Sequence, residues 1–287
     1  MKTRNNIIEL KVMAAAPVTR RARPLRWSRP ALARLMWLGV LGASWGVTPA
    51  LALGEAAPHG TPTVVATAAP RALSQPVKQA NFGQERPSQD ARHVADWVID
   101  ARDNRGLPFV IVDKLDARVY VFYADGRLRA SAPVLLGSAV GDDSVPGIGE
   151  RPLSSIRPEE RTTPAGRFVA DLDKNLRGKQ MLWVDYDSAI SLHPVVTSKA
   201  DERRGERLAS SSTLDNRISY GCINVPADFF KTVVSAAFTK TSGIVYVLPE
   251  TRSPQAVFGS YDVQERATLR RASQGLPVRV AAQVDAQ

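Results

Sequence analysis

Short runs of β-branched and aromatic residues dominate the middle of the chain and predict a mainly β domain. Such runs, bounded by Gly, Pro, Asn or Asp, are typical of strands. Asp125-Gly126 joins two of the runs and is a strong hairpin signal. We expect one core, built as a β-sandwich or an open barrel. The expected strands lie at 109–113, 118–123, 128–136, 167–172, 181–186, 189–192 and 244–248.

Two segments show helical rather than alternating spacing. Apolar residues recur three and four positions apart from Val94 to Ala101, which predicts an amphipathic helix at the start of the domain. A second helix is predicted from Pro226, a residue suited to the first helical turn, with an apolar face that begins at Phe229. The domain therefore combines its strands with one or two helices, and we place its boundaries at residues 92–250.

The amino-terminal end has the three parts of a secretory signal peptide. Residues 1–34 carry nine Lys and Arg against one Glu, and an uncharged apolar run follows at 35–47. Ala50 and Ala52 then stand at the spacing of a cleavage site. The apolar run is shorter than the roughly 20 residues needed to span a bilayer as a helix. We expect residues 1–52 to direct export to the periplasm or cell envelope, with an uncleaved signal anchor as the alternative.

Outside the predicted domain the chain is polar and weakly patterned. Residues 53–91 are rich in Ala, Pro, Thr, Ser and Gln and predict a flexible linker, while residues 251–287 predict a polar tail that is disordered or packed as an appendage. The formal charge is +10, of which the first 34 residues contribute 9 − 1 = +8. Because the basic charge is confined to one end, a nucleic-acid-binding groove is excluded. A membrane contact is expected only transiently, through the signal segment.

Cys222 is the only cysteine of the chain, which excludes an intrachain disulfide and a Cys-rich zinc module. It follows Ser219-Tyr-Gly, where Gly221 permits a tight turn, and precedes the helix predicted from Pro226. The amides and dipole of a helix N-terminus stabilise a thiolate. A lone cysteine in an exported protein is a liability unless it is hidden or useful. Cys222 is therefore a candidate nucleophile, with a small buried hydrophobe as the alternative.

A nucleophilic cysteine needs a base or a lowered pKa, because a free thiol is only a few per cent thiolate at neutral pH. The chain has three histidines. His59 lies in the expected linker and His93 at the edge of the domain, whereas His193 ends a strand inside it. His193 is therefore the candidate base, and a buried structural histidine is the alternative.

Five motifs follow one another along the predicted domain. They are Arg118-Val-Tyr-Val-Phe-Tyr123, Thr162-Thr-Pro-Ala-Gly-Arg-Phe168, Ile190-Ser-Leu-His193, Ser219-Tyr-Gly-Cys-Ile-Asn224 and Gly243-Ile-Val-Tyr-Val247. In this order they resemble the L,D-transpeptidase catalytic domains of the YkuD type, over roughly residues 108–249. The resemblance implies an L,D-transpeptidase-like β-sandwich or open barrel.

The resemblance also implies a substrate, the stem tetrapeptides of peptidoglycan, and a role for each motif residue. Cys222 would attack the carbonyl after residue three and expel the terminal D-Ala, while His193 would take the thiol proton. The substrate-binding and oxyanion side would be formed by Ser219, Tyr220, Gly221 and Asn224, with backbone amides near Gly221 and Cys222 as donors. No metal or organic cofactor is needed. Such domains cross-link diaminopimelate residues, attach proteins to peptidoglycan, or only trim stem peptides.

Departures from the family pattern leave alternatives open. They are Tyr220 where the family usually has His, Asn224 where many members have Arg, and enlarged charged loops at 137–164 and 197–217. The loop charges indicate solvated faces or a lid that binds diaminopimelate carboxylates. Asp142-Asp143 alone has too few carboxylates to predict a cation site. Besides an active transpeptidase, the sequence allows an L,D-carboxypeptidase with water as the acceptor, or a non-catalytic peptidoglycan-binding relative.

Overall fold

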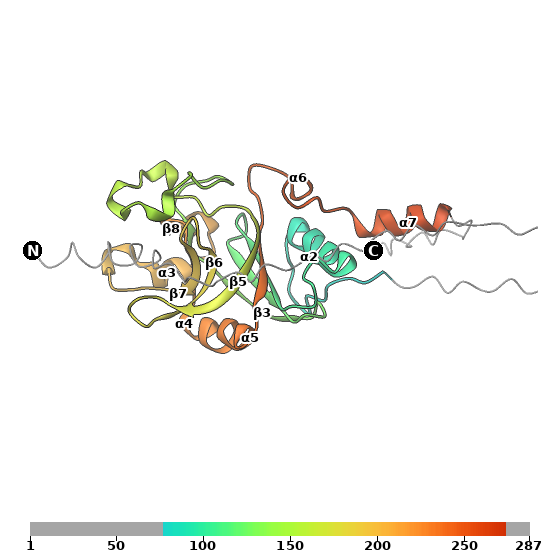
Figure 1. Ribbon diagram of the computed structural model, residues 1–287, viewed down its shortest axis with the longest axis horizontal. Helices are drawn as coiled ribbons and strands as arrows, with labels where there is room; N and C mark the ends of the chain where they lie inside the picture. Colours follow the sequence, from blue (N-terminus) through green and yellow to red (C-terminus); the bar gives the residue numbers. More distant parts are fainter. Residues whose placement is uncertain (1–76, 274–287) are drawn as a thin grey trace, which may run out of the picture. The chain divides into compact units, whose positions relative to one another are not determined.

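An eight-stranded sheet forms the framework of residues 77–273, the part of the chain that the computed structural model describes (Figure 1). In spatial order the strands are β3 (Leu128–Pro133), β2 (Arg118–Phe122), β1 (Phe109–Asp113), β10 (Gly243–Val247), β5 (Gly166–Lys174), β6 (Gln180–Asp185), β7 (Ile190–Pro194) and β9 (Ile223–Val225). Neighbouring strands are antiparallel, except that β1 pairs in parallel with β10 and β7 with β9. A separate parallel pair joins β4 (Leu136–Gly137) to β8 (Arg217–Ser219). The predicted mainly β fold is confirmed.

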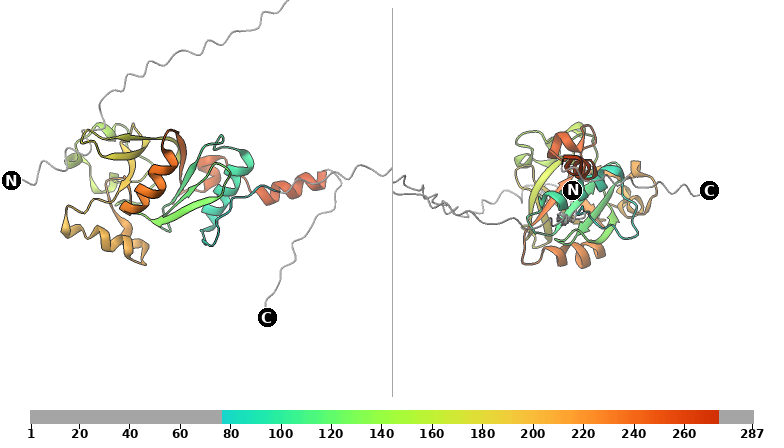
Figure 2. Two further views of the ribbon diagram at one scale, coloured as in Figure 1. Left: turned by 90° about the horizontal axis from the view of Figure 1, so that it is seen from below. Right: turned by 90° about the vertical axis from the view of Figure 1, so that its right-hand side faces the viewer.

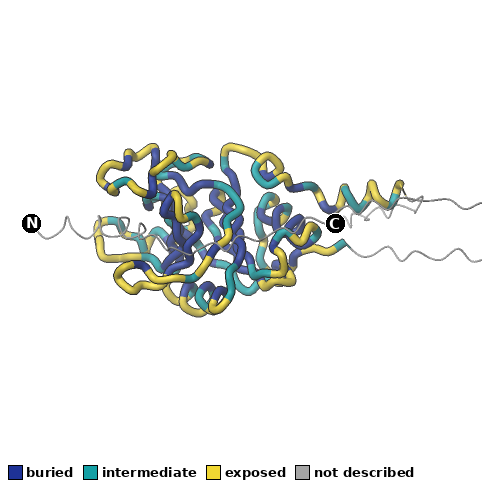
Figure 3. The backbone as a smooth tube through the Cα atoms, viewed as in Figure 1, coloured by how far each residue is buried: buried dark blue, intermediate teal, exposed yellow. Residues whose placement is uncertain are grey.

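The central strands bury side chains on both faces of the sheet, because successive side chains point to opposite faces. On one face, Val110 and Val112 of β1 pack into an aliphatic core. On the other face, Phe109 and Ile111 pack with Tyr120 of β2 into an aromatic-rich core. All of these side chains are fully buried. The dark blue stretches of the backbone in Figure 3 mark the buried residues of the domain. Burying a Val, Ile or Phe stabilises the fold by about 1.5–3 kcal/mol, so these strands form a rigid base.

Helices cover each of these two cores. α2 (Gln89–Ala101) packs its apolar stripe on the aromatic-rich core, and the Ser88 hydroxyl caps its first turn by accepting the Ala91 N–H at 3.0 Å. The aliphatic core is covered by one continuous helical segment, the orange helix of Figure 2. It consists of α4 (Ala227–Phe229), the π-helical η7 (Phe230–Val234) and α5 (Ser235–Phe238). Helices therefore form at both places where helical spacing was expected.

Short helical turns occupy the two long connections, which we term the first loop (residues 137–164) and the second loop (residues 197–217). The first loop contains η2 (Ile148–Glu150), η3 (Leu153–Ser155) and η4 (Pro158–Glu160), and the second contains η5 (Ala200–Glu202), α3 (Arg204–Ala209) and η6 (Thr213–Asn216). Ile148, Leu153 and Ile156 form a small core of the first loop. Within the described residues, no helix has the length and hydrophobicity to cross a membrane.

The packed part of the domain begins before the boundary expected at residue 92. Phe82 is buried in the aromatic-rich core, and the Asn81 N–H donates to the Gly126 carbonyl in the β2–β3 hairpin at 2.9 Å. Both residues lie in the segment 53–91 that was expected as linker. A single apolar residue such as Phe82 shows no helical or alternating spacing with its neighbours. The hydrophobic pattern therefore does not distinguish it from a linker residue. The predicted signal peptide, residues 1–52, lies outside the described residues.

The domain also continues past residue 250. Two helices follow β10, α6 (Pro254–Phe258) and α7 (Val263–Ser273). Between them, the Tyr261 hydroxyl donates to Asp100 of α2 at 2.7 Å. The first part of the expected polar tail is therefore packed on the domain as an appendage, and residues 274–287 lie outside the described part of the chain.

Candidate active site

Cys222 lies in a tight turn between β8 and β9. The turn passes so close to neighbouring segments that a Cβ on Gly221 would lie 2.6 Å from the carbonyl oxygen of Thr162 and 2.7 Å from Cδ1 of Ile190. Gly221 also has a φ of 125°, which residues with side chains rarely adopt. The position directly before Cys222 therefore requires glycine.

Buried hydrogen bonds fix both sides of this turn. The Ser219 hydroxyl donates to the Cys222 carbonyl at 2.6 Å and accepts the Gly221 N–H at 3.0 Å. The Thr163 hydroxyl donates to the Gly221 carbonyl at 2.9 Å and accepts the Gly137 N–H at 2.9 Å. Ser219 and Thr163 are buried, which strengthens these bonds. The backbone that carries Cys222 is thus held both from β8 and from the first loop.

Strand β7 brings His193 beside Cys222. It pairs in parallel with β9, and the register aligns His193 with Asn224, two residues after Cys222. Nδ1 of His193 lies 2.8 Å from the carbonyl oxygen of Pro194. Because a carbonyl only accepts, Nδ1 carries the hydrogen, which leaves Nε2 as the ring nitrogen able to accept a proton from the adjacent Cys222 thiol. The structure therefore brings the two expected catalytic residues together.

The electrostatics of this pair favour a charged nucleophile. Burial has the largest single effect and raises the pKa of the Cys222 thiol, but the interaction with His193 and the hydrogen bonds from the Ser191 N–H and hydroxyl together outweigh it. The result lowers the pKa of Cys222 from 9.0 to about 7. Burial has the largest single effect on His193 and lowers its pKa, but the adjacent Cys222 thiolate and the Pro194 carbonyl together outweigh burial and raise the pKa. Since Cys222 is only partly buried, a thiolate there can be reached by a substrate.

Asn224 supports the backbone of Cys222 rather than facing a substrate. Its side-chain amide donates to the Cys222 carbonyl at 3.2 Å, and its oxygen accepts from Nη1 of Arg204 at 2.7 Å. Asn224 is 1% exposed, which leaves no surface for the substrate contact expected from the sequence. The charge of Arg204 also opposes protonation of His193. Sequence reasoning did not single out Arg204 because the charges of the second loop have no pattern that separates them from a solvated face.

Tyr220 packs against the first loop. Its ring contacts the small core of Ile148, Leu153 and Ile156. The guanidinium of Arg161 lies over the same ring, with Cζ 4.2 Å from the ring centroid. Tyr220 makes both of these contacts through its aromatic ring. The ring therefore connects the turn of Cys222 to the first loop.

The expected oxyanion donors are only partly available. The Gly221 N–H is engaged by the Ser219 hydroxyl, so this amide supports the turn instead of pointing to a substrate oxygen. The Cys222 N–H makes no backbone hydrogen bond within residues 77–273. If Sγ attacked a carbonyl group, the oxyanion that forms on the carbonyl oxygen would therefore find its donor in the amide of Cys222 itself.

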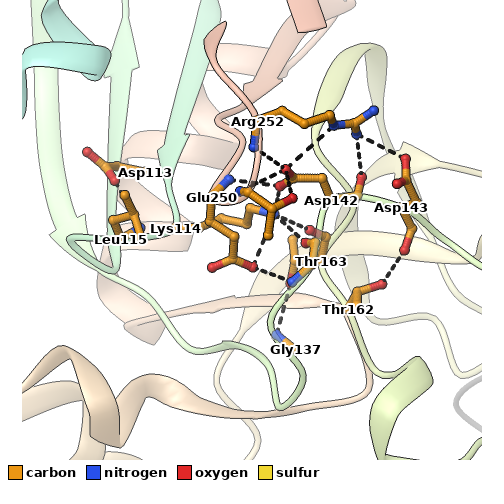
Figure 4. A network of polar contacts seen from close by, with 12 residues as sticks. Asp113, Lys114, Leu115, Gly137, Asp142, Asp143, Thr162, Thr163, Glu250 and Arg252 are labelled. Atoms are coloured by element: carbon orange, nitrogen blue, oxygen red, sulfur yellow. Dashed lines mark hydrogen bonds and ion pairs between the residues drawn. The ribbon is translucent and has the colours of Figure 1, made fainter. Parts of the chain in front are cut away.

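A buried ion cluster anchors the first loop to the end of β1 and to the segment after β10 (Figure 4). Nζ of Lys114 lies 2.8 Å from Oδ1 of Asp142 and 3.3 Å from Oε1 of Glu250. These three side chains are at most 1% exposed. Arg217 of β8 also pairs with Glu250, so each carboxylate has a cation. Removing any member would leave a buried charge without its partner.

Thr163 joins this cluster to the turn of Cys222. Its carbonyl accepts from Nζ of Lys114 at 3.0 Å, while its hydroxyl holds the Gly221 carbonyl. The cluster is therefore one residue away from the backbone that carries Cys222. The sequence did not reveal this link, because Lys114 and Thr163 are far apart along the chain and form no recognisable motif.

Asp142 is an anchor of the first loop. It accepts backbone N–H groups of residues 250, 251 and 252 at 2.8, 2.9 and 3.1 Å. Burial would raise its pKa, but the hydrogen bonds from Lys114, Thr251 and these amides hold the pKa well below its usual range. The oxygens of Asp142 are thus fully used. In the described part of the chain, no three His, Cys, Asp or Glu side chains gather closely enough to hold a metal ion.

Comparison with known proteins gives one family match that contains this site. Residues 108–245, which include Cys222 and His193, match the L,D-transpeptidase catalytic domain family, YkuD. No curated protein gives a significant match to the chain.

Several solved structures resemble the chain at low identity. The catalytic domain of an Enterococcus faecium L,D-transpeptidase is 15% identical with a TM-score of 0.30, and the match covers 49% of this chain and 96% of that one. The helical cell shape determining protein Pgp2 from Campylobacter jejuni is 16% identical with a TM-score of 0.34, covering 58% and 54%. An L,D-transpeptidase from Xylanimonas cellulosilytica is 15% identical with a TM-score of 0.31, covering 49% and 60%. The chain thus spans little more than half of the last two proteins.

Proposed function

We propose that the chain is a cysteine acyltransferase acting on peptidoglycan stem tetrapeptides, on the premise that residues 108–245 match the L,D-transpeptidase catalytic domain family, YkuD. The observation that carries the proposal is the Cys222–His193 pair, in which a partly exposed thiol has its pKa lowered to about 7. A structural cysteine packed as a small hydrophobe has no need of such a pair. The family supplies the substrate class, and the pair supplies the nucleophile.

The reaction that this geometry supports has two halves. In the first, the Cys222 thiolate attacks the carbonyl carbon after residue three, the C–N bond to the terminal D-Ala breaks, and the His193 imidazolium protonates the departing amine. In the second, an acceptor amine attacks the thioester, gives its proton to His193, and releases the Cys222 thiolate. One amide bond is exchanged for another, so no external energy source is needed.

Backbone groups complete the proposed mechanism. The Cys222 N–H would stabilise the oxyanion of the tetrahedral intermediate, where one lost donor typically costs about 3 kcal/mol of the barrier. The Pro194 carbonyl keeps the imidazole in the tautomer that presents Nε2 to the thiol. Ser219, Thr163 and Asn224 hold the turn in place and do not touch the substrate.

The proposed reaction has three variants, which differ in the group that accepts the acyl chain from Cys222. An amine of diaminopimelate gives a cross-link, an amine of a protein gives attachment to the wall, and water gives an L,D-carboxypeptidase. All three share the same acyl-enzyme, so the first experiment addresses the acyl-enzyme and not the acceptor. The substrate lies in the cell envelope, which is also where the predicted signal peptide would direct the chain.

The direct test is intact-mass spectrometry of the full chain incubated with a disaccharide-tetrapeptide. We expect the wild-type protein to gain the mass of the disaccharide-tripeptide acyl group and to release D-Ala. Cys222→Ala should show neither and retain its melting temperature. A folded wild-type protein that gives neither adduct nor D-Ala would contradict the proposal and favour a peptidoglycan-binding relative, whose binding to sacculi would be unaffected by Cys222→Ala.

A further inference from the structure

The two loops beside the site are rich in arginine, and nearly all of these charges are neutralised within the domain. Arg151 and Arg157 pair with Glu160, Arg203 pairs with Glu206, and Arg204 pairs with Glu202. Arg207 donates through Nε and Nη1 to two backbone carbonyls of the second loop, each at 2.9 Å. These arginines hold the loops together, and their N–H groups already have acceptors within the domain.

Arg161 is different. Among residues 77–273 it has no carboxylate partner, and the one hydrogen bond of its side chain runs from Nη2 to the Ile156 carbonyl at 3.2 Å. Its Nε is buried, and no described atom accepts its hydrogen. The nearest acid in sequence, Glu160, is held by Arg151 and Arg157 and has its pKa lowered to about 2 by them. A buried donor without an acceptor is rare in folded proteins and calls for a ligand or a solvent partner.

The position of Arg161 connects this donor to the nucleophile. Thr162 follows it directly, and the Thr162 carbonyl is the group against which Gly221 is packed. The guanidinium itself lies over the ring of Tyr220, two residues before Cys222. Arg161 is thus attached to the turn of Cys222 both through the backbone and through the aromatic ring.

We propose that Arg161 is a carboxylate-binding residue of the active site, and that Tyr220 is the platform that orients its guanidinium. The proposal rests on the stem-peptide substrate proposed above. A guanidinium presents its N–H groups in a planar fork that matches a carboxylate, and stacking on an aromatic ring fixes the plane of that fork. Nη1 and the second hydrogen of Nη2 are the donors left for the ligand, because Nε is buried and one hydrogen of Nη2 is held by the first loop.

A stem tetrapeptide offers carboxylates from two sources: the terminal D-Ala that leaves and the side chain of diaminopimelate. Both are the same chemical group, so the fork of Arg161 fits either. Amidation of one carboxylate at a time separates them. The residue that replaces the family's His at position 220 thereby has a function, since a stacked tyrosine holds the arginine that recognises the substrate.

The test is equilibrium binding to the full chain carrying Cys222→Ala, in which no acyl transfer occurs. The probes are the disaccharide-tetrapeptide, the same molecule amidated at diaminopimelate, and the same molecule amidated at the terminal D-Ala. Arg161→Gln and Arg161→Lys are added to this background. Arg203→Gln is the matched control, because the Arg203 side chain is 69% exposed and already paired with Glu206.

We expect Arg161→Gln to raise the Kd of the unmodified peptide about tenfold or more, which is the size of a lost charge-assisted pair. Arg161→Lys should keep part of the affinity, and Arg203→Gln should change nothing. The peptide amidated at the recognised carboxylate should bind equally well with and without the Arg161→Gln substitution, and this equality identifies which carboxylate is bound.

Two results would overturn the inference. One is an unchanged Kd in Arg161→Gln, or no binding in any protein. The other is an equal loss for all three peptides, which would mean that Arg161 only holds the first loop in shape. Acylation of the wild-type chain is followed separately, so Arg161-dependent binding without an acyl-enzyme would contradict the proposed chemistry while supporting the carboxylate site.

Discussion

The Lys114–Asp142 pair and the Cys222–His193 pair are both interior pairs of opposite charge, yet they differ in how completely their partners are satisfied. Lys114 and Asp142 have no exposed side-chain surface, and each makes several further hydrogen bonds. Cys222 is partly exposed, and His193 is its one charged partner. The first pair is therefore locked in its charge state, whereas the second can exchange a proton.

The pKa values express the same difference. The pKa of Asp142 is held far below neutrality, so this carboxylate stays charged at any pH at which the protein works. The pKa of Cys222 is about 7, so thiol and thiolate are both populated near neutral pH. Many hydrogen bonds keep the Asp142 carboxylate charged and suit it to anchor the first loop. A single charged partner and a partly exposed thiol leave Cys222 able to change its charge, as a nucleophile must. Thr163 connects the two, because it bonds both Lys114 and the Gly221 carbonyl.

The largest effect is expected from breaking the anchor. Lys114→Met leaves Asp142 and Glu250 buried with fewer cations, which should lower the free energy of unfolding by about 3–5 kcal/mol. Chemical denaturation measures the free energy of unfolding of each protein. The control is Lys174→Met, which replaces an exposed lysine of β5. A loss no greater than that of the control would show that the cluster is not an anchor.

Breaking the reactive pair should spare stability and remove activity. His193→Gln takes away the base and the partner of the thiolate, so the rate of acyl-enzyme formation should fall about 10²–10⁴-fold. Rates from intact-mass time courses, with melting temperatures alongside, check this. His93→Gln, in α2 and bonded to Ser260, should leave the rate unchanged. A His193 variant as fast as the control would remove this histidine from the mechanism.

The link between the two regions should give an intermediate effect. Thr163→Val keeps the shape of the side chain but leaves the Gly137 N–H and the Gly221 carbonyl without their partner, which should cost about 1–3 kcal/mol of stability. Acylation should slow as well, because the turn of Cys222 loosens. Thr232→Val, at an exposed threonine of the helix that follows β9, is the control. Equal unfolding free energies for the two variants would argue against the link.

The smallest effect is expected at Tyr220. Its aromatic ring, not its hydroxyl group, contacts the first loop and Arg161. The Tyr220→Phe protein should therefore be acylated at the wild-type rate. Tyr220→Ala removes the ring and should weaken peptide binding. If Tyr220→Phe is impaired as strongly as Tyr220→Ala, the hydroxyl takes part in the chemistry after all.

Local patterns predicted the strands and the candidate catalytic pair, because each depends on residues that are close in sequence. Cys222 follows a glycine and precedes a helix, and His193 ends a buried run, so both stood out as candidates. The expected strand at 128–136 is an exception: it breaks after Pro133, and Leu136–Gly137 pairs with β8 instead. Alternation alone does not show where a strand leaves one sheet for another.

The supporting residues were not predicted, because their partners are distant in sequence. Lys114 meets Glu250 across the whole domain, and Arg204 meets Asn224 across 20 residues. In the sequence Arg161 is indistinguishable from its charged neighbours, and only the fold shows that its Nε is buried without an acceptor among the described residues. Such roles depend on the tertiary fold, and a single sequence carries no local signal for them.

The most direct test of the account is a titration of the Cys222 thiolate by its ultraviolet absorbance in the full chain. The sequence contains one cysteine, so the signal has a single source. The thiolate fraction should fall as the pH decreases through about 7 in the wild-type protein, and the midpoint should move up toward 9.0 in His193→Gln. A wild-type midpoint near 9.0, unchanged in His193→Gln, would show that the histidine does not activate the thiol and would contradict the account.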